Sequence, residues 1–292
     1  MSTRRVQERQ PAFQARTLNH VALEVQDLDR SVAFYQRLFG MPIRSTQVVG
    51  PRRGVAPGLM IGEGPQFIIF MEPTAFVPTD RLADADVSDR RRINHFCLGI
   101  AGFDPDGVVQ TLEARDLRAI RNMREGMRND RIAEIGTTDP DRVFVQIQDQ
   151  SYCGGSGKLG QLCEAGIEYP ERARVPVQPL IAVTSYRGVW LTVTDVSRSV
   201  EFYSGLFDVS SRESSDGATL LMVGRDESFL ALTGGAEPGI SRFSLAVTRF
   251  DPDEVMLALA TVGVSGRRVT SRDNVPAIEF TDPDGITVLL ER

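Results

Sequence analysis

An internal repeat constrains the fold of this chain more than any other feature of the sequence. Residues 27–41, DLDRSVAFYQRLFGM, match residues 195–209, DVSRSVEFYSGLFDV, with Asp, Arg, Ser, Val, Phe, Tyr, Leu and Phe in register. A weaker repeat relates residues 102–117, GFDPDGVVQTLEARDL, to residues 249–264, RFDPDEVMLALATVGV. Self-similarity of this kind indicates that one supersecondary unit recurs along the chain. The two repeats together predict four units.

Every unit combines the same elements in the same order. An alternating strand pattern precedes a helix whose apolar residues, such as Val32, Tyr35 and Leu38, recur at helical spacing. Units two and four close with TTDPDRVFVQIQ, residues 137–148, and FTDPDGITVLLE, residues 280–291, where Asp-Pro-Asp predicts a tight turn before a strand. The unit is therefore a strand, a helix and then about three strands.

The units define the domain organisation that we expect. Residues 17–150 form a first half, residues 186–292 form a second half of the same plan, and residues 151–185 form a Gly-rich loop and linker. Residues 1–16 are basic and polar, lack the apolar region of a secretory signal, and are interpreted as a mobile arm.

Composition limits the classes of protein to which the chain can belong. The 41% apolar and 25% charged residues are typical of a soluble globular protein, and no apolar run approaches the roughly 18 residues that cross a bilayer. The net charge of -6 argues against nucleic acids and anionic membranes as partners. Three cysteines, an odd number, fit a reducing cytoplasm better than a disulfide framework, although Cys153 and Cys163 could pair in a loop. We expect a cytoplasmic protein that binds a small molecule.

The only two histidines of the chain lie in matching strand patterns, LNHVALEV at residues 18–25 and INHFCLGI at residues 93–100. Because side chains alternate along a strand, His20 and His95 lie on the polar faces of these strands, and Gln146 lies on the polar face of the closing strand. An isolated buried histidine is usually a hydrogen-bonded core residue. Two histidines at equivalent positions of neighbouring repeats favour a shared binding site instead.

These motifs carry a resemblance to a known family. LNHVALEVQDLDRSVAFYQRLFGM, INHFCLGI and TTDPDRVFVQIQ resemble the vicinal oxygen chelate superfamily, which includes glyoxalase I, extradiol dioxygenases, and fosfomycin and bleomycin resistance proteins. The resemblance covers nearly the whole chain after residue 17. It implies an α+β fold in which four βαβββ modules form two tandem, cupped, eight-stranded mixed sheets with helices packed outside. It also implies that His20, His95 and Gln146 are metal ligands.

The third of these positions departs from the family pattern, because the family usually has Glu where this chain has Gln146. A neutral amide is a weaker donor than a carboxylate, so the metal would be held less tightly and would keep more Lewis acidity. Glu72, at the end of QFIIFME, could supply a carboxylate instead, although a solvated strand end is the commoner role. Alternatively, Gln146 could bind substrate while water completes the metal coordination.

The second half keeps the repeat but not these side chains, since Gly188, Arg242 and Leu289 replace the two histidines and the glutamine. We interpret it as a structural or substrate-covering half, in which Arg242 either binds an anionic group or forms an internal salt bridge.

The loop SYCGGSGKLGQLC, residues 151–163, does not have the spacing of a phosphate-binding loop. It could cover the cup, with Tyr152 or Lys158 reaching a substrate, or be a plain surface connector.

The leading functional hypothesis is a metal-dependent enzyme with dioxygenase-type chemistry on a small organic substrate that chelates the metal through vicinal oxygens. Fe(II) is favoured, and Mn, Zn or Ni are alternatives. Since no third histidine exists, Tyr152, Glu24 or Gln148 would act as acid or base. The alternatives are a glyoxalase-like isomerase or lyase with Glu72 or Glu24 as base, and a non-catalytic drug-binding protein. The sequence is also compatible with a homodimer that forms through exposed strand edges.

Overall fold

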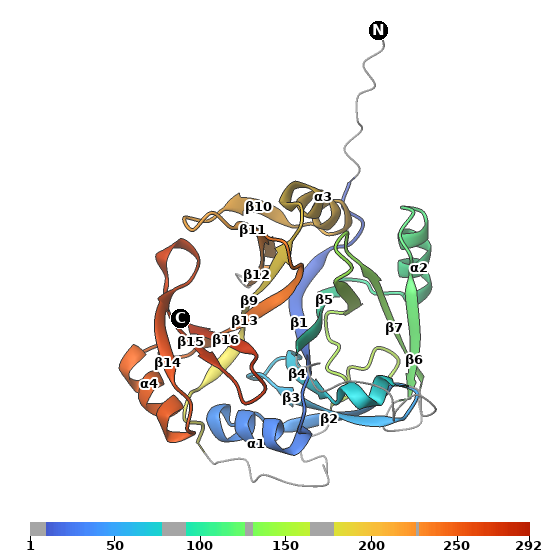
Figure 1. Ribbon diagram of the computed structural model, residues 1–292. Coiled ribbons are helices and arrows are strands. Elements are labelled where there is room, and N and C mark those ends of the chain that lie inside the picture. Colours follow the sequence, from blue (N-terminus) through green and yellow to red (C-terminus); the bar gives the residue numbers. More distant parts are fainter. Residues whose placement is uncertain (1–9, 78–91, 126–130, 164–177, 226–227) are drawn as a thin grey trace.

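The computed structural model describes residues 10–77, 92–125, 131–163, 178–225 and 228–292, and within them two eight-stranded mixed sheets lie side by side (Figure 1). The order of the first sheet is β2-β3-β4-β1-β5-β8-β7-β6, and the second repeats it as β10-β11-β12-β9-β13-β16-β15-β14. The predicted fold class of four βαβββ modules in two tandem sheets is confirmed. Within the described ranges, no helix is both long and apolar enough to cross a membrane.

The elements of the first half are β1 (Ala15–Glu24), α1 (Leu28–Phe39), β2 (Ile43–Val49), β3 (Gly54–Met60), β4 (Phe67–Met71), the 3-10 helix η1 (Pro73–Phe76), β5 (Arg92–Ile100), α2 (Pro105–Glu113), β6 (Ile120–Glu125), β7 (Arg131–Thr138) and β8 (Phe144–Asp149). Those of the second half are β9 (Val183–Val193), α3 (Val196–Leu206), β10 (Ser210–Glu213), β11 (Thr219–Val223), β12 (Ser228–Gly234), β13 (Gly239–Val247), α4 (Pro252–Thr261), β14 (Gly266–Thr270), the 3-10 helix η3 (Arg272–Asn274), β15 (Pro276–Thr281) and β16 (Thr287–Glu291).

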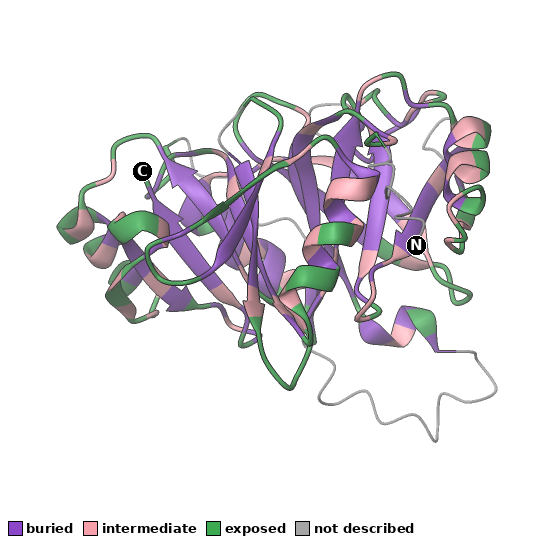
Figure 2. Cartoon of the chain, turned by 90° about the horizontal axis from the view of Figure 1, so that it is seen from above, coloured by how far each residue is buried: buried purple, intermediate pink, exposed green. Residues whose placement is uncertain are grey.

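The repeated motif forms helices with the same N-terminal cap. Asp27 accepts a hydrogen bond from the backbone N–H of Arg30 at the start of α1, and Asp195 does the same at the start of α3. Gly40 caps the C-terminus of α1, and its left-handed φ of 67° suits a residue without a Cβ. The strands are largely buried, whereas the helices expose their outer faces (Figure 2). Each sheet therefore has one helix-covered face and one concave face.

The Asp-Pro-Asp turns have a role that the sequence patterns did not indicate, because each turn binds the first helix of the opposite half. The phenol of Tyr35 on α1 donates a hydrogen bond to Asp282 at 3.0 Å, and the phenol of Tyr203 on α3 donates one to Asp139 at 3.0 Å. All four side chains are buried. The two halves are thus joined by a pair of equivalent contacts, one at each end of a pseudo-symmetric interface.

Both strand starts lie earlier than the predicted boundaries of the halves. β1 begins at Ala15, inside the predicted arm, and just before it Phe13 is buried with its ring centroid 6.0 Å from that of Phe207. β9 begins at Val183, inside the predicted linker. Residues 1–9 of the predicted arm and 164–177 of the predicted linker lie outside the described residues. Phe13 thus packs on the second half, and Ile181, just before β9, donates its backbone N–H to the carbonyl oxygen of Leu38 in the first half at 3.0 Å.

Candidate functional site

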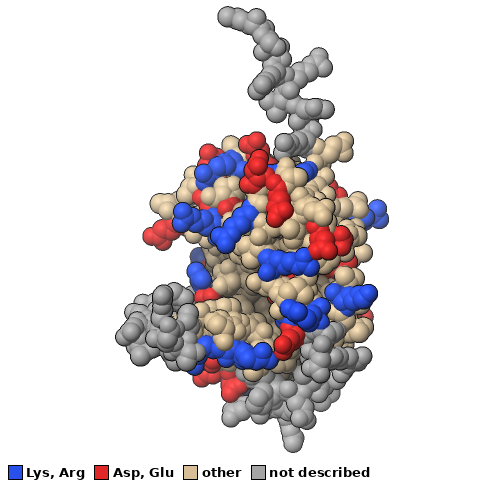
Figure 3. Space-filling model, turned by 90° about the vertical axis from the view of Figure 1, so that its right-hand side faces the viewer, with Lys and Arg blue, Asp and Glu red and all other residues tan. Residues whose placement is uncertain are grey.

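A cavity of about 510 Å³ occupies the concave face of the first sheet. Polar side chains from β1, β5, β7 and β8 and from the loop after β8 line its interior, namely His20, His95, Glu134, Gln146 and Tyr152. Apolar side chains, including Ile69, Met71 and Phe144, cover much of the remaining wall. The side of the molecule to which β6 belongs is hollowed near its centre, with basic side chains around the hollow (Figure 3).

The two histidines turn the same nitrogen atoms toward each other. Nε2 of His20 lies 3.4 Å from Nε2 of His95. Nδ1 of His20 lies 2.9 Å from Oδ1 of Asn19, and Nδ1 of His95 lies 2.8 Å from Oδ1 of Asn94. An amide oxygen only accepts, so each Nδ1 carries the proton and each Nε2 carries a lone pair. The two lone pairs are directed into the same space.

Further hydrogen bonds determine which atom of each asparagine faces its histidine. The Asn19 Nδ2 group donates to the carbonyl oxygen of Tyr152 at 2.7 Å, and the Asn94 Nδ2 group donates to the Glu24 carboxylate at 2.5 Å. Because both amide nitrogens are engaged in this way, both amide oxygens are turned toward the imidazoles. The Asn-His pairs therefore hold the rings in one orientation and one tautomer.

Each asparagine owes its position to a β-bulge between β1 and β5. Leu18 pairs with Leu98 and His20 pairs with Cys97, so Asn19 is the extra residue on β1. Asn94 is the extra residue on β5 in the same sense. The second half has register shifts at the equivalent places between β9 and β13. The bulges therefore belong to the scaffold, and only the first half uses them to place Asn-His pairs.

Burial keeps both imidazoles neutral. It lowers the pKa of His95 to about 4, and burial together with repulsion from His95 lowers the pKa of His20 well below its usual value. The Gln146 amide, whose oxygen accepts a hydrogen bond from a protonated ring, opposes both shifts without reversing them. Neutral imidazoles with free Nε2 lone pairs at neutral pH are in the state in which histidine binds metals.

The donor set fits a divalent transition metal. Two imidazole nitrogens converge, and the amide of Gln146, itself only 5% exposed, reaches both rings from β8. No cluster of three His, Cys, Asp or Glu side chains suited to a metal occurs in the described part of the chain, and the Gln146 amide is a further oxygen donor within reach of both rings. Glu72, the alternative third ligand, is exposed at the end of β4 and does not line the cavity.

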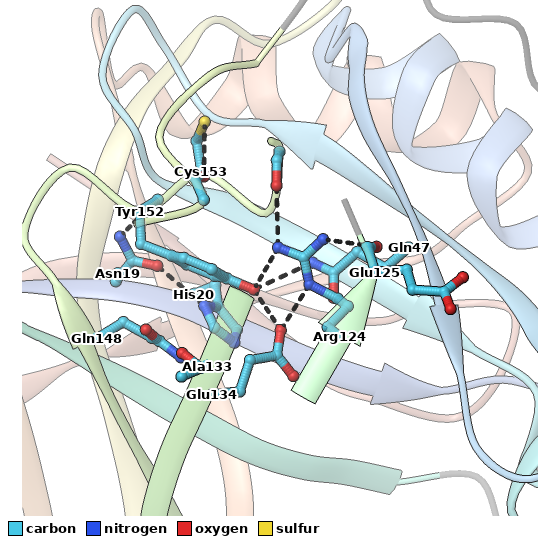
Figure 4. A network of polar contacts seen from close by, with 12 residues as sticks. Asn19, His20, Gln47, Arg124, Glu125, Ala133, Glu134, Gln148, Tyr152 and Cys153 are labelled. Atoms are coloured by element: carbon cyan, nitrogen blue, oxygen red, sulfur yellow. Dashed lines mark hydrogen bonds and ion pairs between the residues drawn. The ribbon is translucent and has the colours of Figure 1, made fainter. Parts of the chain in front are cut away.

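A second polar group lies beside the histidines, and of its members only Tyr152 was predicted from the sequence (Figure 4). Glu134 on β7 lies 2.8 Å from Nε of Arg124 on β6, and the same oxygen of Glu134 accepts a hydrogen bond from the Tyr152 phenol at 2.6 Å. Burial and the Glu134 charge raise the pKa of Tyr152 well above its usual value. Glu134 shares the cavity face with Gly136, which pairs with Gln146, so alternation along RIAEIGTT could have identified it.

Of the three residues predicted to act as acid or base, Tyr152 lines the cavity, whereas Glu24 and Gln148 do not. Glu24 is buried behind Asn94 and forms a 2.9 Å ion pair with Arg92. Gln148 is fully buried and donates to the backbone of Ala133 at 3.3 Å. Neither side chain borders the space in which a substrate would bind.

The loop after β8 contains a disulfide between Cys153 and Cys163, which leaves Cys97 as a free, buried thiol. The odd number of cysteines predicts reduced thiols apart from a Cys153–Cys163 pair in this loop, and the structure forms that pair. Lys158 is exposed and does not line the cavity, so of the two loop residues predicted to reach a substrate only Tyr152 does so.

The equivalent place in the second half is filled by its own side chains. Arg242 lies over the ring of Trp190, 4.9 Å from the centroid, and forms a 3.4 Å ion pair with Glu279. Leu289 packs in the same apolar cluster as Trp190. Of the two roles considered for Arg242, the internal salt bridge is the one formed.

The comparisons agree with this fold. Residues 17–147 match the family model described as the Glyoxalase/Bleomycin resistance protein/Dioxygenase superfamily. The first half of the chain therefore belongs to that superfamily, and the second half repeats its fold. Among curated proteins, no sequence matches this chain.

Solved structures of three enzymes illustrate the shared fold. An extradiol ring-cleaving dioxygenase from B. fuscum has a TM-score of 0.66 at 14% identity, over 97% of this chain and 73% of its own. The 2,3-dioxygenase LapB from Pseudomonas sp. KL28 has a TM-score of 0.67 at 13% identity, over 96% and 93%. The Mn(II)-bound glyoxalase from Novosphingobium aromaticivorans has a TM-score of 0.65 at 12% identity, over 95% and 82%.

Proposed function

We propose that this protein is a metal-dependent enzyme that acts on a small organic substrate bound through vicinal oxygens, with dioxygenase-type chemistry. One observation carries the proposal: the Nε2 atoms of His20 and His95 lie 3.4 Å apart and face each other in the cavity of the first sheet. Two such lone pairs repel each other, and a shared cation removes this repulsion. The similarity to dioxygenases and a glyoxalase supports the class of enzyme at the level of the fold.

In this proposal His20, His95 and Gln146 hold the metal, with Fe(II) favoured over Mn, Zn or Ni. A divalent metal with open positions binds and polarises adjacent substrate oxygens and, if it is iron, supports oxygen activation. Glu134 and Tyr152 are the chain's own proton-transfer pair, since the phenol already donates to the carboxylate at 2.6 Å. The apolar wall of Ile69, Met71 and Phe144 would displace water from the bound substrate.

The Glu134 carboxylate favours a second candidate, a glyoxalase-like isomerase or lyase. Such a reaction needs a base next to the metal-bound substrate, and Glu134 lines the same cavity as the histidines. Oε1 of Glu134 accepts hydrogen bonds from Arg124 and Tyr152. Its other carboxylate oxygen is therefore the one that would accept a proton from the substrate. A non-catalytic drug-binding protein is the third alternative, and it requires neither paired imidazoles nor a base.

Elemental analysis of purified, untagged protein tests the proposal. We expect close to one equivalent of a transition metal, either as isolated or after reconstitution under nitrogen, and its loss in His20→Ala and in His95→Ala. Lys158→Ala, whose side chain is exposed and outside the cavity, is the control and should retain the metal. Equal metal content in all four proteins, or none in any after reconstitution with iron, manganese, zinc and nickel, would refute the enzyme proposed here.

A further inference from the structure

The carboxylates that line the cavity are each paired with an arginine. Glu134 lies 2.8 Å from Arg124, and Glu125 lies 3.1 Å from Arg53 at the rim. Among the described residues of the lining there is no other Asp or Glu and no other Arg or Lys. Behind the wall, Glu24 is likewise paired, with Arg92. The formal charges of the described lining therefore cancel.

The residues placed to hold a metal add no charge either. His20 and His95 donate through neutral nitrogens, and Gln146 replaces the carboxylate that is usual in the family with a neutral amide. A divalent cation bound by this set keeps its whole charge of two in a partly buried site. An uncompensated charge in such a place is unfavourable, because the surrounding dielectric is low.

We propose that this site selects substrates that chelate as anions, and dianions over monoanions, because the described lining of the cavity supplies no unpaired negative charge. The substrate class is therefore an organic molecule with two vicinal oxygens that are both ionised when bound. Examples are the dianion of a vicinal diol and a carboxylate whose α-oxygen is also ionised. The inference rests on the proposed metal site. It makes Gln146 a specificity-determining residue, since a carboxylate at this position would replace one of the charges that the substrate brings.

Calorimetry on protein loaded with Zn²⁺ measures the affinity for three isosteric, unreactive probes. Oxalate is a dianion, oxamate is a monoanion and oxamide is neutral. Metal affinity is measured separately by competition with a fluorescent chelator. In Gln146→Glu we expect at least tenfold tighter zinc binding and at least tenfold weaker oxalate binding than in the wild type, a smaller loss for oxamate, and little change for oxamide.

Two further variants separate local charge from other effects. Arg53→Gln leaves Glu125 unpaired at the rim without touching the metal donors, so oxalate binding should weaken several-fold while zinc binding is not reduced. Gln161→Glu adds the same charge at an exposed site outside the cavity and should change neither affinity.

The outcomes distinguish this inference from the proposed function. If zinc binds and depends on His20 and His95, but oxalate, oxamate and oxamide respond equally to Gln146→Glu, the charge selection is wrong and the metal site remains. If the wild type binds no metal, the proposed function fails and the inference fails with it. A loss of oxalate affinity in Gln161→Glu equal to that in Gln146→Glu would also overturn the inference.

Discussion

Oδ1 of Asn19 lies 2.9 Å from Nδ1 of His20, and this contact directs the Nε2 atom of the ring into the cavity. The equivalent contact of Asn94 with His95 differs in what lies behind it. Asn94 also bonds the Glu24 carboxylate, whereas Asn19 bonds only a backbone carbonyl on its other side. An asparagine oxygen thus orients each imidazole, and the Glu24 carboxylate lies behind the asparagine that orients His95.

We predict that Asn19→Ala and Asn94→Ala each weaken metal binding about 10- to 100-fold, as loss of the partner of a ligating histidine typically does. The affinity falls because the imidazole can then adopt other orientations and the other tautomer, although the histidine ligand itself is still present. Competition with a chelator measures the effect. Ser241→Ala, at the equivalent bulge of the second half, is the matched control and should leave metal affinity unchanged. Unchanged affinity in both asparagine variants would contradict the assigned role.

A second prediction contrasts a buried ion pair with an exposed one. Glu134→Ala should destabilise the fold by about 3–5 kcal/mol, because it leaves the buried Arg124 guanidinium without its partner. Glu125→Ala removes a partner of the largely exposed Arg53 and should cost less than about 1 kcal/mol. Urea denaturation of both variants and the wild type measures the difference. Equal losses would mean that Arg124 is solvated or re-paired after the substitution.

The fold followed from the sequence because its signals are local and repeated. The helix motif and the Asp-Pro-Asp turn before the closing strand each occur once per half, and alternation placed His20, His95 and Gln146 on one concave face. Strict alternation fails at Leu18, which packs in the helix-side core although it lies two residues from His20. One inserted residue in the ladder reverses the face, and no periodicity in a single sequence reveals such a bulge.

The rest of the site depends on contacts between distant segments. Glu134 and Tyr152 meet only because β7 and the loop after β8 lie on the same side of the cup. The contact of Tyr35 with Asp282 crosses between the halves, and the repeat itself does not show which half a turn binds. Propensity and spacing identify elements, whereas tertiary packing decides these pairings.

The disulfide leads to a third prediction. Under denaturing, non-reducing conditions each chain should show one reactive thiol, that of Cys97, and three after reduction. Closing a loop of this length limits the unfolded chain and contributes about 2–3 kcal/mol. The double variant Cys153→Ser with Cys163→Ser should therefore lower the free energy of unfolding by this amount, and Cys97→Ser should keep the disulfide. Three reactive thiols without any reductant would show that the pair is not formed.

The last prediction concerns pH and the contact between the halves. Burial raises the pKa of Asp282 to about 6 from its usual 3.8, so the folded state binds a proton that the unfolded state has already lost between these values. The resulting stabilisation is complete below about pH 4 and is lost as the pH rises through 6, a change of about 3 kcal/mol. Asp282→Asn keeps an acceptor for Tyr35 but does not titrate, so the wild type should lose stability relative to this variant across that window. Urea denaturation of both proteins at pH 4, 5, 6 and 7 measures the difference, with Asp216→Asn, on an exposed turn, as control. A difference that stays constant over this range would place the Asp282 pKa near its ordinary value and show that water reaches the contact.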